Sequence, residues 1–598
     1  MTVRAQDAEA LNKLRLAQEL ENNGDWEHAV VLYEGLYRSD PANFMYFDGL
    51  RRTYTQLKEY DRAVAIIEHR LRTQPKDIVL MSTLAGLQCD AGREAAADSI
   101  WMAAIAADRT NIRVYYVVAA EMIEHRLYDK AVQVYLDGRA VTRSEASFAD
   151  ELATLYLIRM QYAQAVAEWL KRLRQSPDQL PFVQSRLVSM ISRPEALRAA
   201  IETVETEVQR TSGAVGVRRL LAWLYIEEKA FAAAFEQERM IDEQTGANGS
   251  ELFSFGQRML QEQAYPVAAQ AFRTILQTGR NLSLIPQSRF GYARAIESLS
   301  ALHDSSAIAE SGKELSAEAA TFSTALRLYQ EIADASPNSD LAAQSLFRIG
   351  VIKMERFWDL TAALSAFEQV KRLPGMSNLP LDAVLKAGEV LTAQNNLVQA
   401  RAQYQTLVTQ PLTVYQDQAV FRLAELDYFE GEFDSSLAKL ARFKTYLQAD
   451  LANDALQLQY FILENKSSAP SALAEFARAD LLQRQRKSSE ALALFTQIVR
   501  TYPFSLLVDD ALMRAGDLDV LLNQYADAVG AFRLVADSMQ TSIWRDRAQY
   551  RLGELYELSM HDAAHAIDAY EQLLVKFPNS LYAEEARRRI RLLRGDAL

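Results

Sequence analysis

Five alanines recur along the first part of the chain at a constant interval of 34 residues. They are Ala29, Ala63, Ala97, Ala131 and Ala165. The same kinds of residue return around them at fixed offsets: alanine twelve positions earlier in four of the five, and a large apolar residue four positions later in all. A fixed period of this length means that the chain repeats one supersecondary unit, which constrains its fold more than any single residue does.

One repeat has the pattern of two helices joined by a turn. In the first repeat, Leu14 and Ala17 belong to one apolar stripe at helical spacing, Gly24 marks the turn, and Ala29 belongs to a second stripe. Pro41 ends the second helix, because proline has no amide donor and disfavours helical geometry in the residue before it. The two alanines, twelve positions apart, are expected to face each other, because only small side chains let two helices pack at close range. No hairpin can bury its own apolar face, so the repeats must stack into an all-α solenoid.

The pattern continues in weaker form to the end of the chain, and about fifteen helical hairpins account for nearly all of it. We predict four segments. They are a regular array of five repeats over 10–178, degenerate units over 179–302, an inserted loop or hinge over 303–319, and a second array with a capping helix over 320–598. Segment 303–319 is separated from the arrays because it contains no aromatic residue and few branched apolar ones.

These repeats resemble those of the tetratricopeptide family, most clearly over 10–178. The resemblance implies a right-handed superhelix whose concave surface binds an extended or helical segment of another protein. The positions that line this surface in the family carry over to Gln18, Asn22, Asp48, Arg52, Gln56, Arg113, Tyr116, Glu124, Asp150 and Thr154. One subclass clamps a partner's terminal carboxylate with lysines and asparagines. Leu14, Gln18, Asp48 and Arg52 stand at such positions here, so we expect no clamp of that kind. Binding on the convex side remains the alternative to this groove.

The later repeats resemble those of bacterial cell-envelope proteins within the same family. Segment 569–586 carries the likeness, and 336–339 and 502–505 repeat its proline and serine. The relatives implied are the periplasmic coordinator of the Tol-Pal system and the helical lipoprotein of outer-membrane barrel assembly. The resemblance implies a periplasmic or envelope-associated protein. If Met1 is the true start, a cytoplasmic protein is expected instead, because the first residues contain no apolar core of a signal peptide.

Composition excludes several classes of function. The formal charge of −13 argues against non-specific binding of nucleic acid, which needs a basic surface. No apolar run approaches the length of a membrane-spanning helix, so contact with a membrane is expected to be peripheral. Cys89 is the single cysteine, which rules out a disulfide within the chain.

The best catalytic candidate is the pair His561 and His565. Two histidines four apart on one helix can bind zinc, and the intervening sequence resembles the zinc-protease motif with Asp562 in place of glutamate. The segment spans the turn into the second helix of the last repeat, and no third ligand is identifiable. We therefore expect no metal, no cofactor and no enzymatic activity, and we keep a metal-dependent hydrolase only as the weakest hypothesis.

Three functions follow from the sequence. The leading hypothesis is a non-enzymatic scaffold that binds one or more proteins, as a subunit of a bacterial envelope complex. The second is a cytoplasmic regulator whose repeats sense a peptide. The third is the hydrolase that would use His561 and His565. The sequence names neither the partner nor the oligomeric state.

Overall fold

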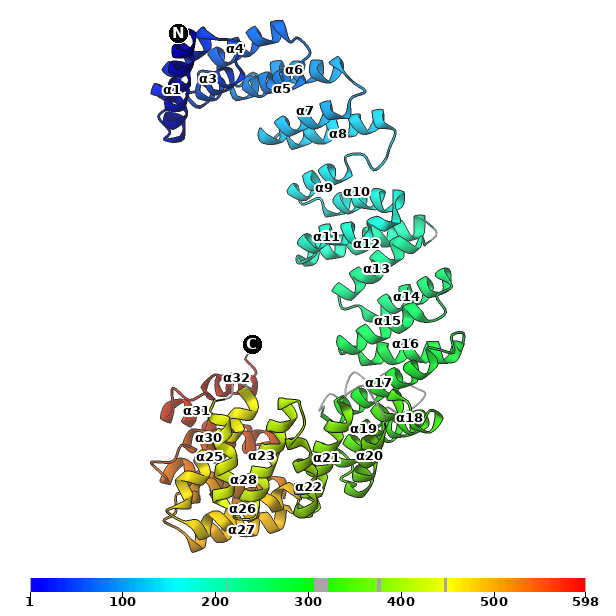
Figure 1. Cartoon of the computed structure of the whole chain (residues 1–598), viewed down its shortest axis with the longest axis vertical. Helices are drawn as coiled ribbons and strands as arrows, with labels where there is room; N and C mark the ends of the chain where they lie inside the picture. The colour runs from blue at the N-terminus through cyan, green and yellow to red at the C-terminus, as the bar shows by residue number, and fades with distance from the viewer. Residues whose placement is uncertain (1, 212, 306–320, 374–377, 446–448, 597–598) are drawn as a thin grey trace. The chain divides into compact units, whose positions relative to one another are not determined.

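The computed structural model describes residues 2–211, 213–305, 321–373, 378–445 and 449–596, and over these residues it contains helices and no strand. The chain divides into two compact units, Met1–Val267 and Ala268–Leu598, which we call unit 1 and unit 2. In each unit the helices pair into hairpins that stack in chain order (Figure 1). The predicted all-α helical-repeat solenoid is thereby confirmed.

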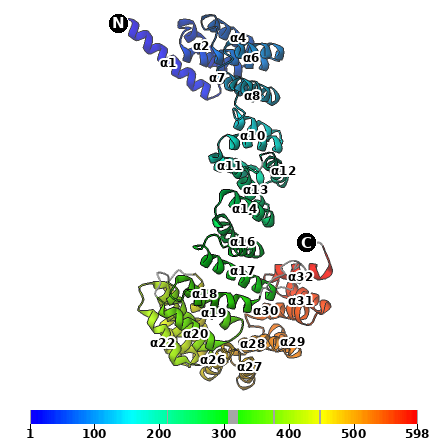
Figure 2. The ribbon, with the colours of Figure 1, turned by 90° about the vertical axis from the view of Figure 1, so that its right-hand side faces the viewer.

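Unit 1 contains the regular repeats, whose helices alternate as the first and second member of each hairpin (Figure 2). They are α1 (Thr2–Asn22), α2 (Trp26–Ser39), α3 (Phe44–Gln56), α4 (Tyr60–Thr73), α5 (Ile78–Asp90), α6 (Glu94–Ala107), α7 (Ile112–Glu124), α8 (Tyr128–Thr142), α9 (Ala149–Ile158), α10 (Tyr162–Gln175), the short turn η1 (Pro177–Gln179), α11 (Leu180–Ile191), α12 (Pro194–Arg210), α13 (Val215–Glu227), α14 (Phe231–Thr245) and α15 (Ser250–Gln261). The boundary between the units falls in the first turn of α16 (Tyr265–Thr278).

Unit 2 contains the remaining helices and three short irregular turns. They are α17 (Ile285–Ser305), α18 (Phe322–Ala335), α19 (Asp340–Glu355), α20 (Leu360–Arg372), α21 (Leu379–Ala393), α22 (Leu397–Val408), α23 (Thr413–Phe429), α24 (Phe433–Leu440), η2 (Ala441–Thr445), α25 (Ala449–Lys466), α26 (Pro470–Arg484), α27 (Ser488–Thr501), α28 (Leu507–Leu521), α29 (Tyr525–Arg533), η3 (Leu534–Ser538), α30 (Arg545–Glu554), η4 (Leu555–Ser559), α31 (Ala563–Lys576) and α32 (Ala583–Arg594).

Small residues form the contact between the two helices of a hairpin in unit 1. All five period alanines are fully buried, and so are the four alanines twelve positions before them, Ala17, Ala85, Ala119 and Ala153. Ala119 and Ala131 belong to one buried cluster, in which Trp101 and Tyr135 supply the large rings. The aromatic residues thus fill the space that the alanines leave open, as the sequence pattern predicts.

In unit 2 the equivalent small position is often glycine, and an aromatic ring of the same hairpin lies directly against it. Four hairpins share this arrangement, with the pairs Gly350 and Phe367, Gly388 and Tyr404, Gly516 and Phe532, and Gly553 and Tyr570. A Cβ atom added to Gly388 would lie 2.4 Å from the Tyr404 ring, so only glycine fits. These glycines are required for packing, since an interior glycine otherwise weakens a helix.

The predicted segment boundaries are not tested by these helices. Of the predicted insertion at 303–319, only 303–305 are described, as the end of α17, and the rest lies outside the described residues. The division between the two compact units falls within the predicted degenerate segment 179–302. The four-segment organisation therefore stays a prediction.

Candidate functional site

The ten residues predicted to line a binding groove all lie on first helices of unit 1 hairpins. Gln18 and Asn22 lie on α1; Asp48, Arg52 and Gln56 on α3; Arg113, Tyr116 and Glu124 on α7; Asp150 and Thr154 on α9. Seven of them are exposed, whereas Asp48, Arg52 and Asp150 are partly buried. The structure distinguishes residues that hold the solenoid together from residues that are free to meet a partner.

Arg52 ties α3 to α1. Its Nε donates to Glu21 Oε1 at 2.6 Å, its Nη2 donates to Glu21 Oε2 at 3.1 Å, and it forms an ion pair with Asp48. The Tyr33 hydroxyl donates to the same Glu21 carboxylate at 2.7 Å. The hydrogen bond to Glu21 raises the pKa of Arg52, although burial opposes this shift. Arg52 and Asp48 therefore act first as structural residues. Glu21 completes the network from α1 and was not among the predicted site residues, although its neighbours Gln18 and Asn22 were.

Asp150 is also committed to the fold. Its carboxylate accepts a hydrogen bond from Trp169 Nε1 at 3.1 Å and another from the Arg186 guanidinium at 2.7 Å. These donors come from α10 and α11, so Asp150 joins three successive helices. The Thr154 hydroxyl donates to the Asp150 carbonyl oxygen at 2.8 Å, inside its own helix.

Arg113 and Tyr116 are the predicted residues best placed to contact a partner. The Tyr116 ring is 37% exposed and lies on an aromatic cluster, with centroids 4.8 Å from Phe148 and 5.9 Å from Tyr135. Arg113 is exposed one helical turn away and forms no ion pair within the described residues. Tyrosine and arginine are both enriched among the residues that contribute most to the binding energy of protein interfaces.

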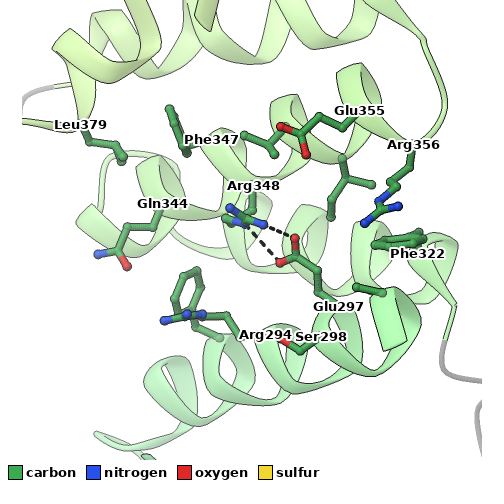
Figure 3. Close-up of a pocket in the computed structure, with 14 residues that line it drawn as sticks. Arg294, Glu297, Ser298, Phe322, Gln344, Phe347, Arg348, Glu355, Arg356 and Leu379 are labelled. Atoms are coloured by element: carbon green, nitrogen blue, oxygen red, sulfur yellow. Dashed lines mark hydrogen bonds and ion pairs between the residues drawn. The ribbon is translucent and has the colours of Figure 1, made fainter. Parts of the chain in front are cut away.

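Unit 2 contains a cavity that the sequence did not indicate (Figure 3). It has a volume of about 390 Å³ and lies among α17, α18, α19 and the start of α21. At its centre the Arg348 guanidinium binds Glu297 through two hydrogen bonds, of which the Nε bond measures 3.1 Å. The Tyr329 hydroxyl donates to the same carboxylate at 2.8 Å, and burial raises the pKa of Tyr329 well above its usual value. Glu297 and Arg348 are 51 residues apart, so no local motif announces their pairing.

Two further arginines line the cavity without an ion-pair partner. In Figure 3, Arg294 and Arg356 lie on opposite sides of the central pair. Both are exposed, and neither takes part in an ion pair within the described residues. The Arg356 guanidinium carbon lies 4.9 Å from the centroid of the Phe322 ring. The cavity thus combines apolar walls with two free cations.

A second, smaller cavity lies beside contacts between residues far apart in the sequence. It has a volume of about 110 Å³, and Trp358 and Arg484 are among its lining residues. Beside it, Arg486 lies 4.0 Å from the Trp358 ring centroid and donates to the Glu355 carbonyl oxygen, 131 residues away in sequence, at 3.0 Å. Repeats in a solenoid are expected to contact only their neighbours. Here the end of α26 returns to the turn after α19, so unit 2 also contains a contact between repeats that are not neighbours.

The histidine pair does not lie on one helix. His561 has a left-handed backbone, with φ at 54°, and α31 begins only at Ala563. The Asp562 carboxylate accepts a hydrogen bond from the His565 backbone nitrogen at 3.1 Å and contacts the His565 ring, as expected of a residue that caps the helix. In the described part of the chain, no group of three or more His, Cys, Asp and Glu side chains is placed to hold a metal ion. None of the described helices is both long and apolar enough to cross a membrane.

The tetratricopeptide repeat family matches residues 547–580, which include most of α30 and all of α31. No curated protein matches the sequence. Three solved structures align over nearly the whole chain. Naa15/Naa10 bound to HypK-THB shows 13% identity and a TM-score of 0.27, and covers 98% of this chain and 97% of its own. Yeast Tom70 shows 12% identity and a TM-score of 0.23, and the alignment covers 96% of this chain and 100% of Tom70. The APC/C hetero-tetramer Cut9-Hcn1 shows 14% identity and a TM-score of 0.20, and the alignment covers 96% of this chain and 95% of the other. These scores are too low to support any argument about function. The chain is an all-α helical-repeat solenoid whose last hairpin, formed by α30 and α31, matches the tetratricopeptide repeat.

Proposed function

We propose that this chain is a non-enzymatic scaffold that binds other proteins through unit 1. The observation that carries the proposal is the exposed pair Arg113 and Tyr116 on α7. Both residues lie on a rigid helix, and the aromatic cluster under Tyr116 fixes the ring in place. The buried contacts of α7 are made by residues such as Val114, Val118 and Ala119, whereas Arg113 is exposed and the Tyr116 ring is only partly covered by the aromatic cluster.

The test is affinity purification from the native organism with wild type and with the variant Arg113→Glu/Tyr116→Ala. Arg52→Glu is unsuitable, because Arg52 holds α1 to α3. A control variant, Arg198→Glu/Val141→Ala, makes the same kind of change at exposed positions on α12 and α8. We expect the first variant to lose at least one partner while the control retains all of them. If both variants melt like wild type and retain every partner, binding through this face is wrong. If Tyr116→Ala lowers the melting temperature, the single variant Arg113→Glu replaces the double variant in this test.

We further propose that the scaffold belongs to a bacterial cell-envelope complex. The support is the resemblance of segment 569–586 to repeats of envelope proteins, in the region where the family match lies. Cell fractionation, with mass analysis of the native amino terminus, tests this location. Recovery with the periplasmic or membrane fraction is expected. Recovery only with the cytoplasm would favour the regulator instead.

A further inference from the structure

We propose that the cavity among α17, α18, α19 and α21 is a docking site for an acidic segment of a partner protein, in which two carboxylates flank a large apolar side chain. This inference rests on the proposed function, namely that the chain binds proteins. It adds a second binding site in unit 2 and states the chemistry that the site recognises.

The first argument concerns charge. Three arginines and two glutamates line the cavity, but Arg348 and Glu297 neutralise each other through two hydrogen bonds. Tyr329 donates to the same carboxylate, so Glu297 has little capacity left for a ligand. Arg294 and Arg356 remain, opposed only by the exposed Glu355. The cavity is therefore positive, although the whole chain has 65 basic and 78 acidic residues.

The second argument compares these arginines with others in the same unit. Arg422 forms ion pairs with both Glu389 and Glu425, and Arg551 forms them with both Asp517 and Glu554. Unit 2 thus supplies carboxylates to arginines that hold its helices together. Arg294 and Arg356 receive none within the described residues, so a carboxylate from outside the chain can pair with each.

The third argument concerns the cavity walls. Phe290, Phe322 and Phe347 contribute half-buried rings, and the buried side chains of Val351 and Ile352 add further apolar lining. Apolar surface of this kind gains free energy when an apolar side chain covers it. A volume of about 390 Å³ is at the lower end of the range for ligand pockets and suits one large side chain with its neighbours.

The fourth argument concerns spacing. Arg294 and Arg356 lie on opposite sides of the central pair in Figure 3, so a segment that crosses the cavity meets a cation at each end. The packing of Arg356 over the Phe322 ring holds its guanidinium in place. A single carboxylate could satisfy only one of the two arginines. The site therefore favours internal acidic side chains over one chain terminus.

The test is a selection of short random peptides, all amidated at the carboxyl end, on the purified full-length protein. We expect enrichment of sequences with Asp or Glu on both sides of Phe, Trp or Leu. A selected peptide is then titrated against wild type, against Arg294→Glu/Arg356→Glu, and against the control Arg289→Glu/Arg500→Glu. The control changes the net charge equally, at exposed positions outside the cavity. Because the target arginines make no ion pairs within the described residues, their replacement is not expected to unfold unit 2.

The expected result is a loss of affinity of about tenfold or more in the cavity variant, because charge-assisted pairs are removed, and a change within about twofold in the control. Affinity should also fall as salt is added. The inference is overturned if the selected peptides are not enriched in Asp and Glu, or if the cavity variant binds the peptide as tightly as the control variant does. A free small carboxylate that competes while no peptide is enriched would also overturn it. Affinity purification with the cavity variant separates the two proposals: retained partners together with a failed selection would leave the scaffold standing and remove only this site.

Discussion

The two units solve the same packing problem with different small residues. In unit 1 the position sixteen residues before the large apolar residue of the second helix is alanine in four of five repeats, and each of these alanines is fully buried. In four hairpins of unit 2 the corresponding position is glycine, with a ring in direct contact with its backbone. The comparison teaches that an alanine is accommodated beside the large residue within the unit 1 hairpins, whereas in these four hairpins of unit 2 the ring leaves no room for a methyl group.

A second difference concerns where the polar side chains are used. In unit 1, Arg93 pairs with Asp61 and Lys130 with Asp98, each across 32 residues to the next hairpin. In unit 2, Arg486 donates a hydrogen bond to a carbonyl oxygen 131 residues away. In unit 1, Tyr116 is exposed and available to a partner, whereas in unit 2 the Arg294 and Arg356 side chains line a cavity.

The largest effect is expected from overfilling the tight contact in unit 1. Ala131→Trp should lower the free energy of unfolding by more than about 3 kcal/mol, beyond moderate overpacking, because Ala131 is fully buried in the cluster that holds Ala119. Thermal and denaturant melts measure the change. A melt equal to that of wild type would mean that the hairpin register is wrong.

A single methyl group should distinguish the two small positions. Gly388→Ala should cost about 1–3 kcal/mol, because the new Cβ would lie 2.4 Å from the Tyr404 ring. The control Gly530→Ala adds the same group where no atom lies within 4 Å, so it should stabilise α29 by up to about 1 kcal/mol. Denaturant melts of the two variants give the comparison. Equal effects of the same sign would contradict the proposed role of the glycines.

The long-range contact in unit 2 should contribute less. Arg486→Gln removes the packing on Trp358 and the bond to the Glu355 carbonyl, at a cost of about 1 kcal/mol. Hydrogen exchange should quicken around 355–358, far away in sequence. Arg93→Gln in unit 1 breaks an exposed pair and should cost at most about 0.5 kcal/mol, with local effects only. Exchange confined to the neighbourhood of residue 486 would show that the contact does not hold α26 in place.

A separate prediction concerns the dependence of stability on pH. Burial, and then repulsion from Asp509, raise the pKa of Asp510 to about 7. The folded state therefore binds the Asp510 proton more tightly than the unfolded state does. Protonation of Asp510 contributes its full stabilisation of the folded state below about pH 4, and this contribution is lost as the pH rises to about 7. Asp510→Asn, which can still accept the hydrogen bond from Trp544, should raise the melting temperature of unit 2 above pH 7 and weaken its pH dependence. The exposed Asp454→Asn is the control. If the melting temperature of Asp510→Asn depends on pH as that of wild type does, the pKa of Asp510 is not raised in the folded protein.

The repeat period predicted the fold because packing in a solenoid is local. Ala29 and its equivalents reveal the hairpin register at a fixed spacing, and the buried alanines lie where that register puts them. The functional surfaces could be predicted less well from the sequence, because they depend on contacts between repeats. Arg52 stands at one of the family's groove positions, but its hydrogen bonds to Glu21 give it a structural role between α3 and α1. The cavity surrounds the pair Glu297 and Arg348, and their separation of 51 residues does not correspond to the repeat period.

The central claim, that unit 1 binds a partner through α7, is tested most directly by placing a photo-activated cross-linking residue at position 116 in the native organism. A matched probe at Val188 on α11, which is also exposed, is the control. The account predicts a discrete covalent adduct with another protein from position 116 and none of the same mass from position 188. Absence of an adduct at 116, or identical adducts from both positions, would contradict the claim.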